Sequence, residues 1–232
     1  MKTIGLLGGM SWESTVHYYT FINEYVKEKL GGLHSAKVLM YSVDFAPIAK
    51  MQEEDNWQAA GEILADAAEG LEKAGADCIV ICANTMHKVT EQIEARISVP
   101  VLHIADAAAD ALLRDGIRRT GLLGTKYTLT QDFIIKKLQE RGLEVILPDG
   151  EDIDTVNDII YGELCLGVIN DASREKYCRI IKKMKDAGAE GVILGCTEIG
   201  MLVEQKDACL PVYDTTLLHA RMAAAFALEE EK

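Results

Sequence analysis

Hydrophobic residues along the chain follow two alternating patterns. Short, uninterrupted apolar runs are typical of strands buried on both faces, whereas longer stretches with an apolar residue every three or four positions are typical of helices covering a sheet. The short runs predict strands over residues 3–8, 37–43, 78–82, 99–104, 119–124 and 144–147. The periodic stretches predict helices over residues 14–30, 57–73, 86–96, 106–114, 129–141 and 215–230, with two more between 152 and 187. This alternation indicates an α/β protein with parallel sheets flanked by helices.

The second half of the chain repeats the first half. TIGLLG at residues 3–8 returns as RTGLLG at 119–124, AGADCIVI at 74–81 returns as AGAEGVIL, and Val-Pro-Val at 99–101 returns as Leu-Pro-Val. One such match is common among α/β chains, but three matches in the same order, at offsets of 116, 113 and 111 residues, favour internal duplication. We therefore predict two pseudo-symmetric, doubly wound parallel-sheet lobes, residues 1–104 and 105–213. A C-terminal helix within residues 214–232 is expected to pack back on the first lobe.

Composition and charge exclude several classes of protein. A net charge of −13 opposes binding to nucleic acid or to an anionic membrane surface, because both attract basic patches. No apolar run reaches the roughly 20 residues that span a bilayer, and the first residues lack the cleavage site of a signal peptide. The six cysteines show no disulfide or zinc pattern, so we expect free thiols, no metal and a cytoplasmic location.

The repeat aligns two polar loops that follow equivalent strands. Ala83 precedes Asn84 and Thr85 in the first half, and Cys196 precedes Thr197-Glu198 at the equivalent place in the second. Ligands in such folds bind at the carboxyl ends of strands, so we expect both loops to face one ligand in the cleft between the lobes. Two thiols so placed could remove a proton from one face of a carbon and return one to the other face. That is the geometry of a two-base racemase or epimerase, which needs no cofactor.

The motifs GLLGGMSWEST, CANTMH, GLLGT, ELCLG and GCTEIG occur in this order over nearly the whole chain. Together they resemble the aspartate/glutamate racemase family, and especially its bacterial branch acting on L-aspartate and L-glutamate. The resemblance implies a pyridoxal-independent (PLP-independent) amino-acid racemase without a cofactor, acting on aspartate or glutamate, usually as a homodimer. It also implies that Cys196 is one acid/base residue, that Glu198 assists it, and that Ala83 stands where the family carries the other Cys or Thr.

The same resemblance implies a set of residues that contact the substrate. Asn84, Thr85 and Thr197 offer short donors that would hold the α-carboxylate and the charge developing in the transition state, although they are also ordinary helix caps. Cys165 stands near a position where some aspartate-specific relatives carry Lys, which leaves the choice between aspartate and glutamate open. The full set of expected substrate contacts is Met10, Gln52, Asn84, Thr85, Thr125, Leu166 and Thr197.

Alanine at position 83 is the difference from the family's motif that has the largest consequence for the chemistry. A methyl group carries no proton, so the chain as written should be impaired in reversible two-base racemization. Either a Cys or Thr has been substituted at this position, which the intact Asn84 and Cys196 motifs favour, or a natural homologue has lost or changed its reaction. The alternatives are a one-thiol decarboxylase of the same superfamily that uses Cys196, and an amino-acid-binding homologue without turnover. Cys82 is a poor substitute, because adjacent strand residues face opposite ways.

Overall fold

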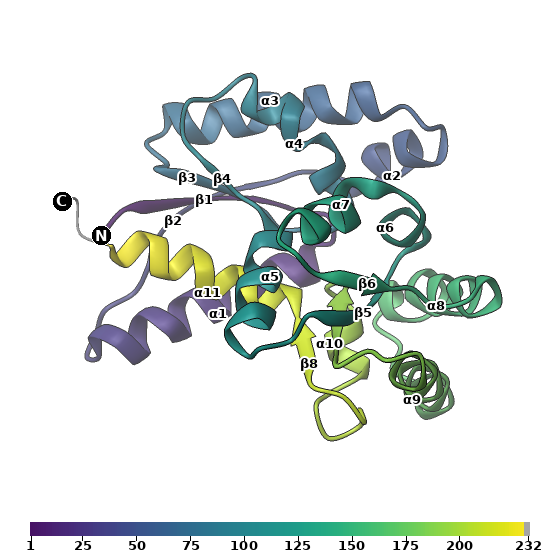
Figure 1. Cartoon of the computed structure of the whole chain (residues 1–232). Coiled ribbons are helices and arrows are strands. Elements are labelled where there is room, and N and C mark those ends of the chain that lie inside the picture. Colours follow the sequence, from purple (N-terminus) through teal and green to yellow (C-terminus); the bar gives the residue numbers. More distant parts are fainter. Residues whose placement is uncertain (230–232) are drawn as a thin grey trace. The chain divides into compact units, whose positions relative to one another are not determined.

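The structure, a computed structural model, describes residues 1–229 (Figure 1). Two compact units make up the chain: residues 1–103 together with the segment from His219 onward form the first, and Ile104–Leu218 form the second. Each unit contains one four-stranded parallel sheet flanked by helices. The α/β class and the two parallel sheets predicted from the hydrophobic pattern are therefore confirmed.

The sheet of the first unit has the strand order β2-β1-β3-β4. Its strands are β1 (Thr3–Gly8), β2 (Lys37–Ser42), β3 (Cys78–Ile81) and β4 (Val101–Leu102). Its helices are α1 (Trp12–Leu30), α2 (Phe45–Glu53), α3 (Trp57–Lys73), the 3-10 helix η1 (Thr85–Val89), α4 (Thr90–Glu94) and most of α11 (Thr215–Leu228). One core cluster joins β1 and β3 to Tyr18 and Ile22 of α1 and to four alanines of α11 at helical spacing: Ala220, Ala223, Ala224 and Ala227.

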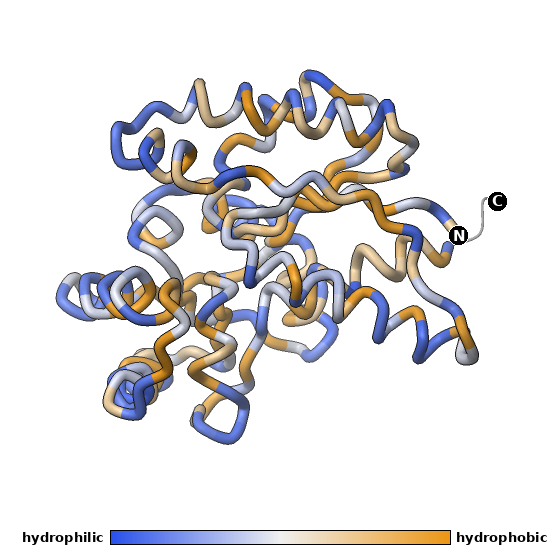
Figure 2. Tube along the Cα trace, turned by 180° about the vertical axis from the view of Figure 1, so that it is seen from behind, coloured by the Kyte–Doolittle hydropathy of each residue, from blue (hydrophilic) through white to orange (hydrophobic). Residues whose placement is uncertain are grey.

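The sheet of the second unit repeats this order as β6-β5-β7-β8. Its strands are β5 (Arg119–Gly124), β6 (Glu144–Ile146), β7 (Gly191–Gly195) and β8 (Val212–Asp214). Its helices are α5 (Ile104–Arg114), α6 (Lys126–Thr130), α7 (Asp132–Glu140), α8 (Gly150–Gly162), the 3-10 helix η2 (Leu164–Leu166), α9 (Asp171–Asp186), the four-residue α10 (Ile199–Leu202) and the start of α11. In Figure 2, hydrophobic residues are concentrated along the strands, and they alternate with hydrophilic residues along the outer helices.

Several elements differ from the sequence prediction. The predicted helix over 129–141 is two helices, because Gln131 has extended backbone (φ −109°, ψ 153°) and separates α6 from α7. The hydrophobic pattern missed α2, which begins after Asp44, whose Oδ1 accepts a hydrogen bond from the Ala46 N–H. The strand expected over 99–104 is shorter, since α5 already begins at Ile104. The last residue of the helix expected over 215–230, and the last three of the segment 214–232, lie outside the described residues.

Glycines allow close packing at the carboxyl ends of the central strands. Gly124 of β5 pairs in register with Gly195 of β7, and a Cβ atom on Gly124 would lie 2.9 Å from the Gly195 carbonyl oxygen. No larger residue fits there without a shift of the backbone. The loops that follow these two strands therefore leave the sheet side by side. Within residues 1–229, every helix is too short or too polar to span a bilayer.

Candidate active site

The first unit places the loop after β3 at the carboxyl end of its sheet. Ala83 is 6% exposed and Asn84 is 5% exposed, and Thr85 begins η1 directly after them. A local hydrogen bond stabilises the loop, because the His87 ring Nδ1 lies 2.8 Å from the Ala83 carbonyl oxygen, four residues earlier in the chain. The His87 backbone N–H also donates to the Asn84 carbonyl oxygen, at 3.1 Å. Position 83 is therefore presented by a short, tightly hydrogen-bonded segment.

Met10 and Gln52 belong to the same unit as Ala83. Met10 follows the neighbouring strand β1 and is 5% exposed, and its loop is fixed by a 2.9 Å hydrogen bond from the Gly9 N–H to the Thr15 Oγ1. Because β1 and β3 are parallel neighbours, the Met10 loop and the Ala83 loop lie at the same end of the sheet. Gln52 of α2 is 5% exposed and donates from Nε2 to the Met86 sulfur atom at 2.8 Å. This contact joins α2 to η1.

The second unit presents Cys196 directly after β7. The Cys196 Sγ–H donates to the Glu198 Oε2 over 3.0 Å, and the Thr197 hydroxyl donates to the same oxygen over 2.7 Å. Cys196 and Glu198 are 8% and 6% exposed. Burial raises the pKa of Cys196 well above its ordinary value, and the negative charge and accepted hydrogen bond of Glu198 raise it further. The thiol is therefore protonated at neutral pH and donates a hydrogen bond to the Glu198 carboxylate.

A thiol can be activated either by a local positive potential or by a hydrogen-bonding partner. The structure provides the partner, Glu198, and the helix that follows, α10, has only four residues. Such a short helix has little macrodipole to lower the pKa of Cys196, and the Glu198 charge raises it, so the thiol stays protonated beside a carboxylate that accepts its hydrogen bond.

Further polar side chains surround Cys196 within the second unit. Thr125 is 5% exposed and caps α6, accepting from the Thr128 N–H at 3.4 Å. Burial raises the pKa of Tyr161, and electrostatic interaction with Cys196, Tyr127 and Cys165 raises it further, so Tyr161 lies near these groups. The sequence interpretation missed Tyr127 and Tyr161, although each lies next to a motif that it used, GLLGT and ELCLG. Leu166 of η2 is 71% exposed.

Cys82, considered as a substitute thiol, lies fully buried in the core of the first unit. It directly follows β3, which ends at Ile81, one residue earlier than predicted, and its Sγ–H donates to the Val80 carbonyl oxygen at 3.7 Å. Burial strongly raises the pKa of Cys82, as it does that of Cys196, so both thiols are protonated at neutral pH. Among residues 1–229, no group of three or more His, Cys, Asp or Glu side chains is arranged to hold a metal ion.

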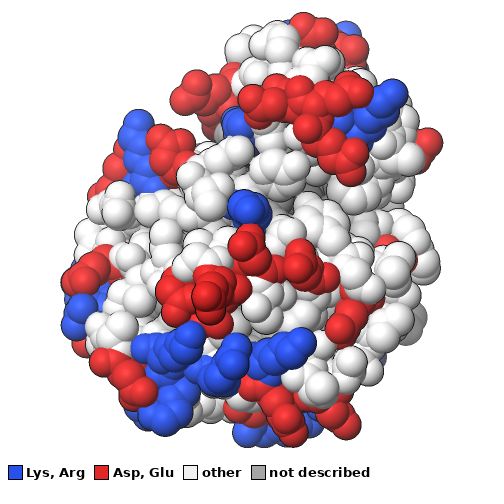
Figure 3. All heavy atoms as spheres, turned by 90° about the vertical axis from the view of Figure 1, so that its right-hand side faces the viewer, with Lys and Arg blue, Asp and Glu red and all other residues white. Residues whose placement is uncertain are grey.

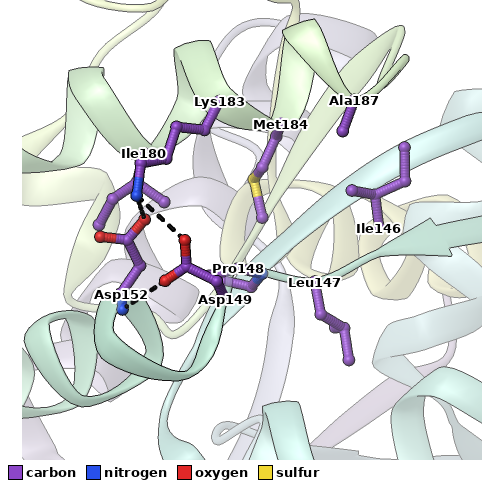
Figure 4. A pocket seen from close by; sticks show the side chains of 9 residues that line it. All are labelled: Ile146, Leu147, Pro148, Asp149, Asp152, Ile180, Lys183, Met184 and Ala187. Atoms are coloured by element: carbon purple, nitrogen blue, oxygen red, sulfur yellow. Dashed lines mark hydrogen bonds and ion pairs between the residues drawn. The ribbon is translucent and has the colours of Figure 1, made fainter.

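A cavity of about 210 Å³ lies elsewhere in the second unit, between the end of β6, the start of α8, and α9 (Figure 4). Lys183 closes one side of it by ion pairs to Asp149 (3.0 Å) and to the buried Asp152 (2.6 Å). None of the residues expected to contact a substrate lines this cavity, and its charged groups are already paired with one another.

The face of the molecule drawn in Figure 3 shows Lys and Arg side chains gathered in a band beside carboxylates.

The chain is similar to known proteins over both units. The family model of the Asp/Glu/hydantoin racemases matches residues 7–223. A crystal structure of a candidate Asp/Glu racemase from Yersinia pestis is 53% identical, with a TM-score of 0.93, and the match covers 99% of this chain and 100% of that one. An aspartate racemase homologue from Pyrococcus horikoshii OT3 is 39% identical, with a TM-score of 0.87 and the same coverage. The broad specificity amino-acid racemase RacX of Bacillus subtilis is 24% identical over 225 residues, 94% of this chain and 95% of its own length.

Proposed function

The chain belongs to the Asp/Glu/hydantoin racemase family, as its motifs predict, and we propose that it is a PLP-independent enzyme that moves the α-proton of an amino acid through Cys196. Aspartate and glutamate are the proposed substrates. The observation that carries the proposal is the buried hydrogen bond from the Cys196 thiol to the Glu198 carboxylate at the carboxyl end of β7. The proposal requires that the loops after β3 and β7 act on one substrate, as the internal repeat predicts.

The proposed proton transfer balances within the Cys196–Glu198 pair. The thiol proton passes to the Glu198 Oε2 over the 3.0 Å hydrogen bond, which leaves a thiolate and a neutral carboxylic acid. The thiolate then takes the α-proton, and the electron pair of the Cα–H bond is delocalised into the substrate carboxylate. Donors from Asn84, Thr85 and Thr197 would stabilise the charge that develops on those oxygens. The reverse sequence returns a proton to the same face of the substrate.

Because position 83 is alanine, the proposed chemistry has a proton-transfer group, Cys196, for only one face of the substrate α-carbon. Position 83 is equivalent to position 196 in the repeat, but its methyl group neither takes nor gives a proton. We therefore expect exchange of the α-proton at one face to be much faster than inversion, for which the second face must be protonated by water. The same feature favours a second candidate function, in which the Cys196 thiol protonates the carbanion that remains when a diacid substrate loses CO2.

The test follows α-proton exchange and inversion separately. Each enantiomer of aspartate and glutamate is incubated with the protein in D2O, loss of the α-proton is followed by 1H NMR, and inversion is followed by chiral chromatography. We expect exchange from one enantiomer without inversion at a comparable rate. Cys196→Ala should abolish exchange, whereas Cys209→Ser, which changes an exposed thiol, should not alter it.

Two results would redirect or reject the proposal. Release of CO2 from an arylmalonate, without α-proton exchange in any amino acid, would favour the decarboxylase. If the folded protein and its Ala83→Cys variant both fail to exchange or invert any amino acid, the racemase proposal is wrong. The homodimer that the resemblance implies and the cytoplasmic location expected from the cysteine usage belong to the same proposal. Light scattering at several protein concentrations would measure the mass of the assembly.

A further inference from the structure

Three buried histidines form a cluster in the first unit, and one of them bonds the loop that carries Ala83. His87, His103 and His219 are 2%, 7% and 0% exposed. The centroid of the His87 ring lies 4.5 Å from that of His103 and 5.6 Å from that of His219. Residues 87 and 219 belong to η1 and α11, and residue 103 directly follows β4. The ring of His87 is therefore held between two segments that are distant in the sequence.

The partners of His219 determine which of its nitrogens carries the hydrogen. Its Nε2 lies 2.6 Å from the Leu102 carbonyl oxygen, and its Nδ1 lies 2.8 Å from the Tyr18 hydroxyl. A carbonyl oxygen only accepts, so Nε2 carries the hydrogen and Nδ1 accepts from the Tyr18 O–H. His219 is therefore fixed at both nitrogens, by α1 on one side and by β4 on the other.

His87 requires the opposite tautomer. Its Nδ1 faces the Ala83 carbonyl oxygen at 2.8 Å, so Nδ1 must carry the hydrogen and donate it. Burial, together with the two neighbouring imidazoles, lowers the pKa of His87 well below its ordinary value, so the ring is neutral. A buried polar ring is unfavourable unless it is hydrogen-bonded, and an apolar side chain would fill this core at lower free-energy cost. The polar ring is therefore best explained by the hydrogen bond that it makes.

We propose that His87 is a positioning residue, whose Nδ1–H holds the Ala83 carbonyl so that the Asn84-Thr85 segment is presented to the substrate in one conformation. The rings of His103 and His219 fix the orientation of His87, and the Thr90 hydroxyl holds its backbone by donating to the His87 carbonyl oxygen at 2.8 Å. The effect on turnover rests on the function proposed above, but the hydrogen bond and the order of the loop do not.

Two polar substitutions separate positioning from packing. Asn at position 87 places an amide N–H near the position of Nδ1, whereas Gln places it near that of Nε2. We therefore expect His87→Asn to retain the hydrogen bond to Ala83 and His87→Gln to lose it. His17→Gln is the matched control, because His17 is an exposed histidine on α1 of the same unit.

Amide hydrogen exchange and NMR test the proposal without reference to activity. We expect His87→Gln to raise the rate of amide hydrogen exchange at residues 84–86 about tenfold or more, which corresponds to the loss of one hydrogen bond. His87→Asn and His17→Gln should leave that rate within about threefold of the parent. Long-range 1H–15N spectra of the parent should show His87 protonated at Nδ1 and His219 protonated at Nε2. An Nε2-protonated His87, or unchanged exchange in a folded His87→Gln variant, would overturn the proposal.

Kinetics add a second, separable readout. If the protein exchanges α-protons, His87→Gln should lower kcat about tenfold with a smaller change in KM, and His87→Asn should restore it. Equal kcat in the Gln and Asn variants would show that the ring only fills space. If the parent protein exchanges no α-proton, the proposed function fails, whereas hydrogen exchange and the tautomers still decide whether His87 holds the loop.

Discussion

The substitution Glu198→Gln tests the proposed proton pathway most directly. It keeps the shape of the side chain but removes the negative charge, whose oxygen lies 3.0 Å from the Cys196 sulfur. At that separation a thiolate and a carboxylate repel each other by about 5.5 kcal/mol if the effective dielectric constant is about 20. Even a third of this energy, about 1.8 kcal/mol, changes the thiolate fraction at a given pH more than tenfold. We therefore expect Cys196 to ionise much more readily in the Gln variant.

The assay compares two reactions that should change in opposite directions. Iodoacetamide reacts with thiolates, so alkylation of Cys196 at pH 8 should be at least about tenfold faster in Glu198→Gln. Exchange of the substrate α-proton should instead slow about a hundredfold, because an amide cannot take up the thiol proton. Mass spectrometry follows alkylation of Cys196 and of Cys209, an exposed thiol in the same molecule that serves as an internal reference.

An unchanged or slower alkylation of Cys196, with Cys209 reacting as before, would refute the argument that Glu198 holds the thiol protonated. Faster alkylation together with undiminished proton exchange would show instead that Glu198 sets the thiol pKa without carrying the proton.

Three further predictions concern position 83, the histidine cluster and the close packing of β5 against β7. Ala83→Cys should raise the rate of inversion about a hundredfold or more, measured by chiral chromatography, and no gain would argue against a proton-transfer role for position 83. Because burial lowers the pKa of His87, the unfolded chain binds a proton near pH 6.5 that the folded chain does not. The free energy of unfolding is therefore retained above that pH, and it falls by about 1.4 kcal/mol per pH unit below pH 6. Urea unfolding at pH 7.5 and 5.0 should show this loss to be smaller in His87→Asn, and equal losses would contradict it. Gly124→Ala should lower the free energy of unfolding by about 1–3 kcal/mol, whereas Gly150→Ala, where a Cβ meets nothing within 4 Å, should not; equal thermal midpoints would count against the close strand packing.

The parts of the fold that the sequence predicts are those with a local signature. The strands are predictable because β1, β3, β5 and β7 are buried almost throughout and therefore read as apolar runs. The same runs expose the repeat, and the repeat aligns Ala83 with Cys196 through its 113-residue offset. Glu198 lies two residues from the thiol whose hydrogen bond it accepts, so the motif alone indicates that the two side chains lie close together.

The parts that escape prediction depend on contacts between distant residues. Tyr18 and His219 are separated by 201 positions, and no periodicity in either segment indicates that their side chains meet. His87 can be placed only near the loop, because its hydrogen bond to Ala83 depends on a ring orientation that His103 and His219 impose. Tyr161 is similar, since its proximity to Cys196 arises from the way α8 and η2 pack in the second unit.

The placement of α11 has a consequence for how the protein matures on the ribosome. The second unit is one continuous segment, whereas the first is interrupted and needs α11 to complete its core. During synthesis β1 and α1 therefore emerge some two hundred residues before His219, the partner of Tyr18. We expect the nascent first half to remain a substrate for chaperones until α11 has been synthesised. His219, whose ring packs against the ring of His87, is therefore synthesised long after the loop that carries Ala83.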